Sequence, residues 1–131
     1  MSLQVHTDFA ADLAAITVVD QMTEGRVYPL LIGATAQLPA ISYQIRDGDR
    51  EAFYRDSFGL EIYNVQLDIY SDSYVTNQTI YDAIIDRFNG FSGVIGTGTD
   101  VQRIIVASTL NSVDSDDPSI YRTILELTLT V

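Results

Sequence analysis

The stretch Leu60 to Ser71 reads Leu-Glu-Ile-Tyr-Asn-Val-Gln-Leu-Asp-Ile-Tyr-Ser, and its apolar and polar residues alternate. This period of two is typical of a strand with one buried and one solvated face. Directly after it the period changes, because Ile80, Ile84 and Phe88 recur every four residues. Such spacing predicts an amphipathic helix over about Tyr74 to Phe88. Strand and helix therefore present one apolar side, and the rest of the chain must cover it.

Three further segments alternate in the same way and predict strands that extend the sheet. They are Ala40 to Asp47, Gln102 to Ser112 and Ile120 to Val131. Ile105 interrupts the alternation of the second segment, so we expect that strand to be buried on both faces. Near the N-terminus, Thr7 is a suitable cap for a short helix from Asp8 to about Ile16.

The order of these elements predicts an α+β fold. We expect about four strands in a mainly antiparallel or mixed sheet, with the short N-terminal helix and one longer central helix packed on one face. Thr17 to Glu24 is ambiguous between a turn and a second short helical piece, and Gly25 to Pro29 indicates a brief extended segment that proline stops. With 131 residues, of which 47% are hydrophobic, the chain suits one domain over residues 1–131.

The segment Gly90 to Asp100 contains four glycines and predicts a flexible linker. Within it, the run Gly96-Thr97-Gly98-Thr99 has a superficial likeness to a phosphate-binding loop. Such loops open directly into a helix and are often followed by lysine, whereas here a strand is expected next and the chain has no lysine. We therefore do not expect a phosphate site.

The net charge of −11 is the most informative total. A surface this acidic repels nucleic acid and anionic lipid, so it argues against specific nucleic-acid binding and membrane binding and favours protein partners. No apolar run reaches the roughly 20 residues of a membrane span, and no signal-peptide pattern opens the chain. All seven basic residues are arginine, which suits contact surfaces, although a base-composition bias of the source genome explains this equally well. We expect a soluble protein inside the cell.

No group of residues demands catalysis. His6 is the only histidine, and cysteine and lysine are absent, so the usual bases that activate a nucleophile are missing. Asp114 to Pro118 is an acidic turn without the twelve-residue pattern of a calcium loop. Asp47, Asp49 and Glu51 leave a paired-carboxylate mechanism open, although clustered acids in a turn are mostly just solvated. We therefore expect no enzyme, with no catalytic residue, no metal site and no cofactor.

A long loop from Gly48 to Gly59 mixes aromatic residues with charges of both signs. Loops of this length often carry a function. This one is either a contact arm that orders against a neighbouring subunit, or a hairpin extension whose aromatic residues fold back on the sheet. Aromatic residues and arginine dominate binding energies at protein contacts. The candidate subunit-interface residues are Arg50, Phe53, Tyr54, Arg55 and Phe58.

Three stretches follow one another in a recognisable order. They are Gly25 to Pro29 with Leu38 to Gln44, then Val65 to Ser71, and finally Asp114 to Leu127. In this order they resemble the tail completion proteins of long-tailed phages, also described as tail terminator or tail-to-head joining proteins. The likeness lies in a Gly-Arg-apolar-Tyr-Pro run before a Leu-Pro strand, a strand-to-helix core, and an acidic turn before a closing strand. It covers about residues 5–130.

The resemblance implies an α+β subunit with helices on one sheet face, which assembles with itself as a ring, typically a hexamer, on the end of the tail tube. Its other partners would be the tail-tube protein and a head-completion protein of a phage or prophage. The expected location is the virion tail, and the host cytoplasm during assembly. DNA would pass through the ring without specific binding. The acidic residues expected to line the lumen are Asp47, Asp49, Glu51 and Asp56.

Two alternatives stay open. A head-side connector or stopper of the same machine is hardly separable from a terminator by the order of its elements. A small ligand-binding domain is the other class, in which Tyr28, Tyr43 and Tyr70 gather around a pocket. Tyrosines spaced along strands are more often half-buried packing residues with the hydroxyl at the surface.

Overall fold

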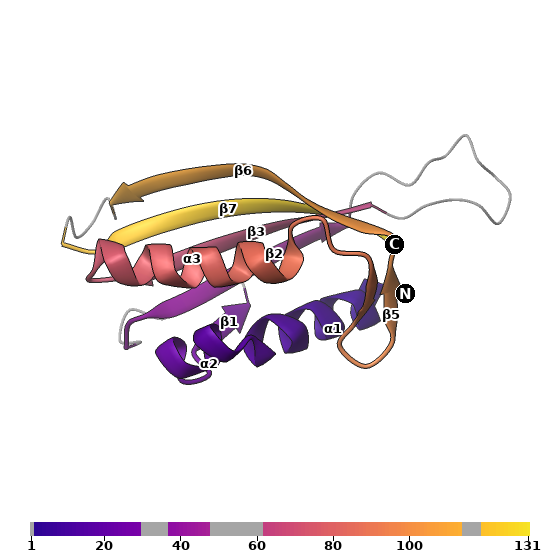
Figure 1. Cartoon of the computed structure of the whole chain (residues 1–131), viewed down its shortest axis with the longest axis horizontal. Coiled ribbons are helices and arrows are strands. Elements are labelled where there is room, and N and C mark those ends of the chain that lie inside the picture. The colour runs from indigo at the N-terminus through magenta and orange to yellow at the C-terminus, as the bar shows by residue number, and fades with distance from the viewer. Residues whose placement is uncertain (1, 30–36, 48–61, 114–118) are drawn as a thin grey trace, which may run out of the picture.

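The computed structural model describes residues 2–29, 37–47, 62–113 and 119–131. These residues form three helices and seven strands (Figure 1). The helices are α1 (Ser2–Ala15), α2 (Thr17–Thr23) and α3 (Tyr74–Phe88). The strands are β1 (Val27–Pro29), β2 (Ala40–Asp47), β3 (Ile62–Ser71), β4 (Gly93–Ile95), β5 (Thr99–Val101), β6 (Arg103–Val113) and β7 (Tyr121–Thr130).

Five of the described strands form one mixed sheet in the order β1-β2-β3-β7-β6, and β4 pairs with β5 in a separate two-stranded sheet. β1 runs parallel to β2, and the other neighbouring pairs are antiparallel. The last strand of the chain, β7, lies between β3 and β6 (Figure 1). This order makes β6 an edge strand.

The predicted architecture of about four strands with one short and one longer helix is wrong. Strands β1, β4 and β5 have three residues each, too few to show an alternating pattern, yet all three are paired. The N-terminal helix is also nearly as long as the central one, with 14 residues against 15. A second short helix, α2, follows it.

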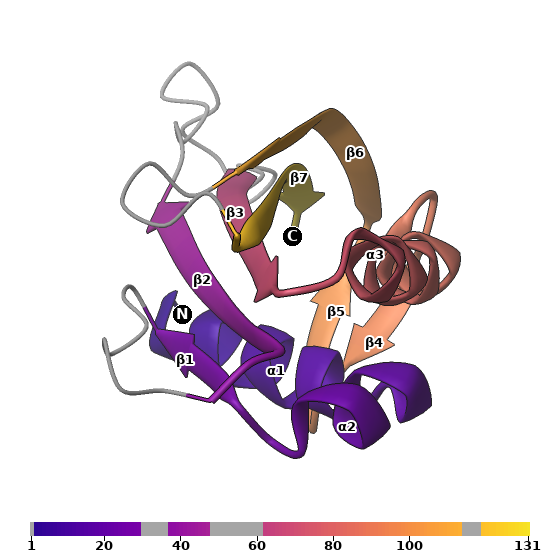
Figure 2. The same cartoon turned by 90° about the vertical axis from the view of Figure 1, so that its left-hand side faces the viewer.

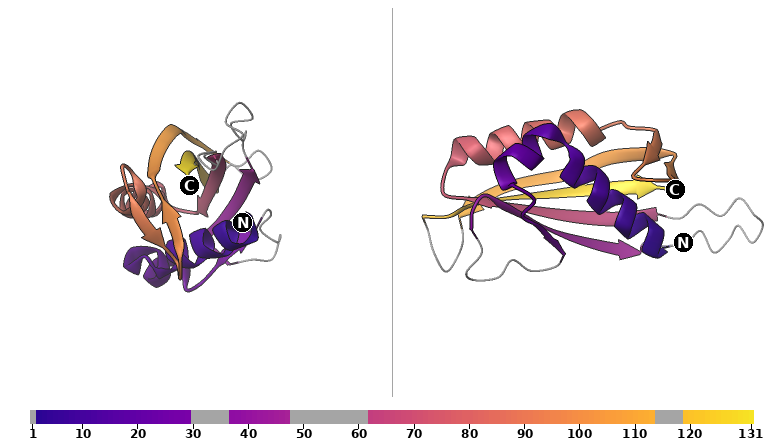
Figure 3. Two further views of the ribbon diagram at one scale, coloured as in Figure 1. Left: turned by 90° about the vertical axis from the view of Figure 1, so that its right-hand side faces the viewer. Right: turned by 90° about the horizontal axis from the view of Figure 1, so that it is seen from below.

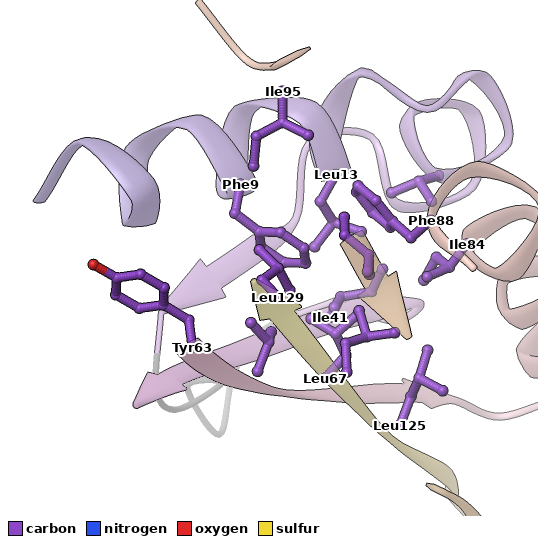
Figure 4. Packing of buried hydrophobic residues seen from close by; sticks show 14 of the residues in the cluster. Phe9, Leu13, Ile41, Tyr63, Leu67, Ile84, Phe88, Ile95, Leu125 and Leu129 are labelled. Atoms are coloured by element: carbon purple, nitrogen blue, oxygen red, sulfur yellow. The ribbon is translucent and has the colours of Figure 1, made fainter. Parts of the chain in front are cut away.

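All three helices lie on one face of the five-stranded sheet (Figures 2 and 3). The core forms where they meet that face, and Figure 4 shows side chains from α1, α3 and the strands converging there. The rings of Phe9 on α1 and Phe88 on α3 stack with their centroids 5.0 Å apart. Fully burying such a side chain contributes about 2 to 3 kcal/mol. Helices distant in sequence are thus joined through the same apolar cluster.

The helix α1 begins at Ser2, so the predicted start at Asp8 is wrong and Thr7 is an interior residue rather than a cap. Val5, Phe9 and Leu13 are all buried and follow one another at four-residue intervals. The apolar stripe therefore extends one turn further toward the N-terminus than predicted.

The boundaries predicted for β2 and α3 are confirmed. The Ser73 hydroxyl accepts a hydrogen bond from the Thr76 amide at 3.4 Å, which caps the start of α3. After the helix, Gly90 adopts a positive φ of 77°, a conformation that costs glycine little. Local capping residues and apolar periodicity agree here, which is why this segment was predictable.

The expectation that β6 is buried on both faces is wrong. Ile104 is its one fully buried residue, and every residue of 107–113 is exposed. A β-bulge between Val106 and Ser108 separates the two halves. Because β7 occupies the position beside β3, β6 is displaced to the edge of the sheet.

Candidate functional site

The residues predicted to form the subunit interface and the acidic lumen fall almost entirely outside the described part of the chain. Asp47 is the exception, because it ends β2 and is paired with Tyr63 of β3. The others lie within residues 48–61. They are Arg50, Phe53, Tyr54, Arg55 and Phe58 for the interface, and Asp49, Glu51 and Asp56 for the lumen. Both sets stay predictions.

The most densely hydrogen-bonded polar group in the described residues is the Asp8 carboxylate on α1. It is almost fully buried, with 2% exposure. Its Oδ1 accepts hydrogen bonds from the Thr97 amide at 3.2 Å and hydroxyl at 3.1 Å. Its Oδ2 accepts from the Thr99 amide at 2.9 Å and hydroxyl at 2.5 Å. One carboxylate therefore holds the middle of the turn that joins β4 to β5 and the first residue of β5.

These bonds hold the Asp8 carboxylate in its ionised form. The pKa of Asp8 lies below its ordinary value, and the hydrogen bond from the Thr99 hydroxyl lowers it most. Burial acts in the opposite direction and raises the pKa. The hydrogen bonds from the Thr97 amide and hydroxyl and from the Thr99 amide lower it further. The four donors are supplied by β5 and the turn before it, which lie beside α1, between α1 and α3 (Figure 2). The arrangement is structural: it fixes the hairpin on the helix.

The approach of the hairpin to α1 requires glycine at position 96. A Cβ at Gly96 would lie 2.6 Å from Cα and Cβ of Asp8, a distance that real Cβ atoms do not adopt. Its φ of +55° is also left-handed. Both observations explain why a residue without a side chain stands directly before Thr97, the first of the two threonines that bind Asp8.

A second carboxylate, one helical turn further along α1, extends this contact to α3. Asp12 forms two hydrogen bonds of 2.7 Å with the Arg87 guanidinium and accepts a third from the Gly96 amide at 3.3 Å. The Asp12 hydrogen bonds raise the pKa of Arg87 above its ordinary value. The guanidinium also lies 4.5 Å from the centroid of the Phe91 ring. We call Asp8, Asp12, Arg87 and residues 96–99 the hairpin clamp.

The prediction of a flexible linker over Gly90 to Asp100 is therefore wrong. Backbone amides in a glycine-rich turn do form an anion-binding concavity, as in a phosphate loop. In this chain the amides of Gly96, Thr97 and Thr99 are taken by Asp12 and Asp8. The signal in the sequence was a pair of aspartates four residues apart beside the apolar stripe of α1, which places both on one side of a helix.

A shallow hollow of about 320 Å³ lies beside the clamp, lined by Asp12, Ala15, Ile16, Thr17 and Arg87. Its two charged groups are bonded to each other, so neither is free to recognise a charged ligand. The tyrosine pocket of the ligand-binding alternative is absent from the described residues. Tyr43 is paired with the buried Leu67 on the helix-covered face, whereas Tyr70 is on the opposite face beside the Arg122 guanidinium.

The sheet face opposite the helices is polar. Arg122 pairs with Asp68 at 2.8 Å, and Asp68 also accepts a hydrogen bond from Gln66 at 3.1 Å. Across the described residues, no group of three or more histidine, aspartate or glutamate side chains is placed to hold a metal ion. In the same part of the chain, no helix has the length and apolar character needed to span a membrane.

Exposed apolar side chains gather toward one end of the molecule, at the far end from the clamp. Tyr74 and Val75 open α3, and the Tyr74 ring packs edge-on against Tyr121 of β7 with centroids 6.0 Å apart. Val113, which is paired with Tyr121, and Leu110 lie on the neighbouring edge strand β6. This end of the molecule therefore offers apolar contact area, which the pattern of β6 had suggested would be internal.

Comparison with known proteins gives a structural likeness without a sequence family. No protein-family model matches the sequence, and no curated protein matches it. A chain in the solved virion of a native gene transfer agent (GTA) particle has a similar structure, with a TM-score of 0.61 and 15% sequence identity. The similarity covers 97% of this chain and 90% of that one. The two chains share a fold over nearly their whole length.

Proposed function

We propose that this protein is a structural subunit of a phage-like particle, which closes the end of the tail tube as a ring and forms part of the joint to the head. The whole-length fold similarity to a chain of a gene transfer agent virion is the observation that carries the proposal. The three sequence stretches that resemble tail completion proteins support the finer assignment to the tail end. A structural rather than a catalytic role agrees with both.

The architecture of the described residues suits such a role. The clamp fixes α1, the β4–β5 hairpin and α3 to one another through charged hydrogen bonds, which gives a rigid body. A rigid body carries a contact arm at defined geometry, and the segment 48–61 connects the ends of β2 and β3. In the proposed ring this segment supplies contacts to the next subunit through Tyr54 and Arg55.

Charge supplies a second part of the proposal. With a net charge of −11, the subunit repels DNA, and a ring of such subunits lets the genome pass without retaining it. Asp47, Asp49, Glu51 and Asp56 are the proposed lumen residues. The proposed partners are further copies of the chain, the tail-tube protein and a head-completion protein, in the virion tail and, during assembly, in the host cytoplasm.

The test is to polymerise the tail-tube protein encoded beside this one, with and without this protein, and to inspect tube ends by negative-stain electron microscopy. Halted growth with extra density at one end is the expected result. Bare ends with unchanged growth would contradict a terminator. If the protein then binds purified heads, we would assign it to the head side, as a connector or stopper.

Replacing Tyr54 and Arg55 by alanine tests the contact arm in the same assay. We expect weaker capping with an unchanged melting temperature, because the residues serve contacts between subunits. Val94→Ala is the control, since Val94 is a surface residue with 56% exposure on β4. A melting temperature that falls as much as capping does would assign Tyr54 and Arg55 to the core instead.

A further inference from the structure

The two edges of the five-stranded sheet are unequal. β1 has three residues and ends in Pro29, so it offers little backbone to another strand. β6 has eleven residues. Natural edge strands are protected by charged side chains, by proline or by β-bulges. Residues 104–113 of β6 contain no charged residue and no proline, and the one bulge, between Val106 and Ser108, lies before the second half of the strand. A long, uncharged edge of this kind is a template for another strand.

The first half of this edge is closed by the segment that follows α3. The Gly90 amide donates to the Ile104 carbonyl at 2.8 Å, and the Ile104 amide donates to the Phe91 carbonyl at 3.0 Å. The Asn89 side chain accepts from the Val106 amide at 3.4 Å. Past the bulge, none of the described residues makes a backbone hydrogen bond to the outer side of β6. Within the described part of the chain, the open part of the edge is therefore 107–113.

The register of β6 with β7 identifies the backbone groups that face outward. In an antiparallel ladder, residues alternate between bonding to the partner and pointing away from it. Ile104 points away, and the bulge moves the alternation by one residue. Beyond the bulge, the outward groups belong to Thr109, Asn111 and Val113. Each of them presents one N–H and one C=O to a neighbouring strand.

The side chains along this half of β6 also lack cover. Leu110 is 58% exposed and Val113 is 47% exposed. Thr109 and Asn111 meet α3 through Tyr81 and Gln78, in exposed side-chain hydrogen bonds of 3.2 and 3.0 Å. Apolar groups and unpaired backbone together favour an extended partner that adds a strand.

We propose that a second copy of this chain covers this edge, with its own β6 running antiparallel so that the two sheets become continuous. A register centred on Asn111 pairs Asn111 with Asn111 of the second copy, and Thr109 with its Val113. All three outward residues of each copy then bond, which gives about six backbone hydrogen bonds. Both copies use the same residues, as a two-fold contact requires.

The edge itself identifies a second copy's β6 as the occupant, because its outward groups at Thr109, Asn111 and Val113 are complementary to themselves in an antiparallel pair. Two copies that each carry −11 repel one another, so contact is least opposed where neither surface is charged. The strand residues 104–113 meet that condition in both copies at once. A two-fold contact does not build a ring, so the pair describes the protein before it meets other virion proteins, independently of the proposed function.

Cysteine trapping tests the register, because the chain contains no cysteine. Across the two-fold centre the Cα atoms of position 111 would lie about 5.5 Å apart, within reach of a disulfide. Asn111→Cys should form a covalent dimer under mild oxidation. Ser112→Cys is the matched control, since its counterpart lies diagonally at roughly 7 to 8 Å. Equal crosslinking at positions 111 and 112, or none at 111, would overturn the proposal.

Sedimentation velocity on the unmodified chain provides a test that does not depend on a cysteine variant. We expect a monomer–dimer equilibrium that strengthens with salt, since salt screens the net charge. Thr109→Pro removes an outward N–H, and Leu110→Glu adds a charge to the edge, so each should weaken dimerisation at least about tenfold. Val94→Glu, at a residue 56% exposed on β4, controls for the added charge and should leave dimerisation within about twofold. A monomer at every concentration, or a dimer that neither β6 variant weakens, would rule the contact out.

Discussion

The Gly96–Thr99 turn and the second half of β6 differ both in composition and in how far their polar groups are bonded to the rest of the fold. The turn is rich in glycine, yet it is held by four hydrogen bonds to the buried Asp8 carboxylate. The strand residues 107–113 have a strand-forming, partly apolar composition, yet all of them are exposed. In the turn, backbone amides are bound by a buried carboxylate, whereas the outward backbone amides of the strand have no partner among the described residues. Whether a segment of this fold is fixed therefore depends on the hydrogen-bond partners that the tertiary structure brings to it, and not on its composition.

The largest expected effect comes from removing the Asp8 carboxylate. Asp8→Ala leaves the buried Thr99 amide and hydroxyl without their acceptor, so we expect the melting temperature to fall by roughly 12 °C. Asp100→Ala, at an exposed acid in the same hairpin, should change it by less than about 2 °C. Equal changes in the two variants, measured by circular dichroism, would mean that the turn is held by something other than Asp8.

Acid should weaken the clamp in a predictable direction. The pKa of Asp8 is lower in the folded state than its ordinary value of 3.8, which stands for the unfolded chain. Its contribution to stability is therefore complete above that value and is lost as pH falls through the folded pKa. We expect the difference in melting temperature between the parent and Asp8→Asn to shrink between pH 7 and pH 2. A difference that stays constant over this range would contradict the assignment.

Gly96→Ala comes next in size. The new Cβ would clash with the backbone of Asp8, and the alanine residue would have to adopt a left-handed φ. We therefore expect the free energy of unfolding to fall by about 2 kcal/mol, which lowers the melting temperature by roughly 8 °C. Gly98→Ala is the control, because a Cβ there would meet only the flexible Gln4 side chain at 3.4 Å. Urea unfolding of both variants measures the difference. A loss at Gly98 as large as that at Gly96 would point to glycine flexibility rather than close approach.

A smaller effect is expected at the other end of the clamp. Arg87→Gln removes the two hydrogen bonds to Asp12, but the arginine side chain is 37% exposed and solvent screens the pair. We expect a loss of about 1 kcal/mol. A double-mutant cycle with Asp12→Asn isolates the coupling between the two side chains. Additive losses would show that they act separately.

The smallest effect on folding is expected on the edge strand. Leu110→Ser removes an apolar side chain that is 58% exposed, so the free energy of unfolding of the monomer should change by less than about 0.5 kcal/mol. Urea unfolding under dilute conditions, where any pairing between copies is absent, gives the value. A loss comparable to that of Gly96→Ala would mean that β6 supports the core as strongly as the clamp does.

Local patterns predicted the segments whose structure depends on close neighbours in sequence. The bounds of β2 and α3 agree with the predictions because alternation and four-residue spacing are set by the strand and helix periods themselves. β1 lies inside the extended segment predicted from Gly25 to Pro29, whereas β4 and β5 were too short to carry such a pattern. The candidate site was less predictable, since the proposed interface residues rest on composition and the clamp was missed altogether.

The sequence by itself determined where the central strand and helix lie, which of their sides is apolar, and that the molecule is strongly acidic. Tertiary structure alone decided that Asp8 binds Thr99, which is 91 residues away, and that β7 enters between β3 and β6. The physical reason is range. Periodicity is fixed within a turn or a strand pair, whereas the pairing of a buried carboxylate and the order of strands are fixed only when distant segments meet and every buried polar group must find a partner.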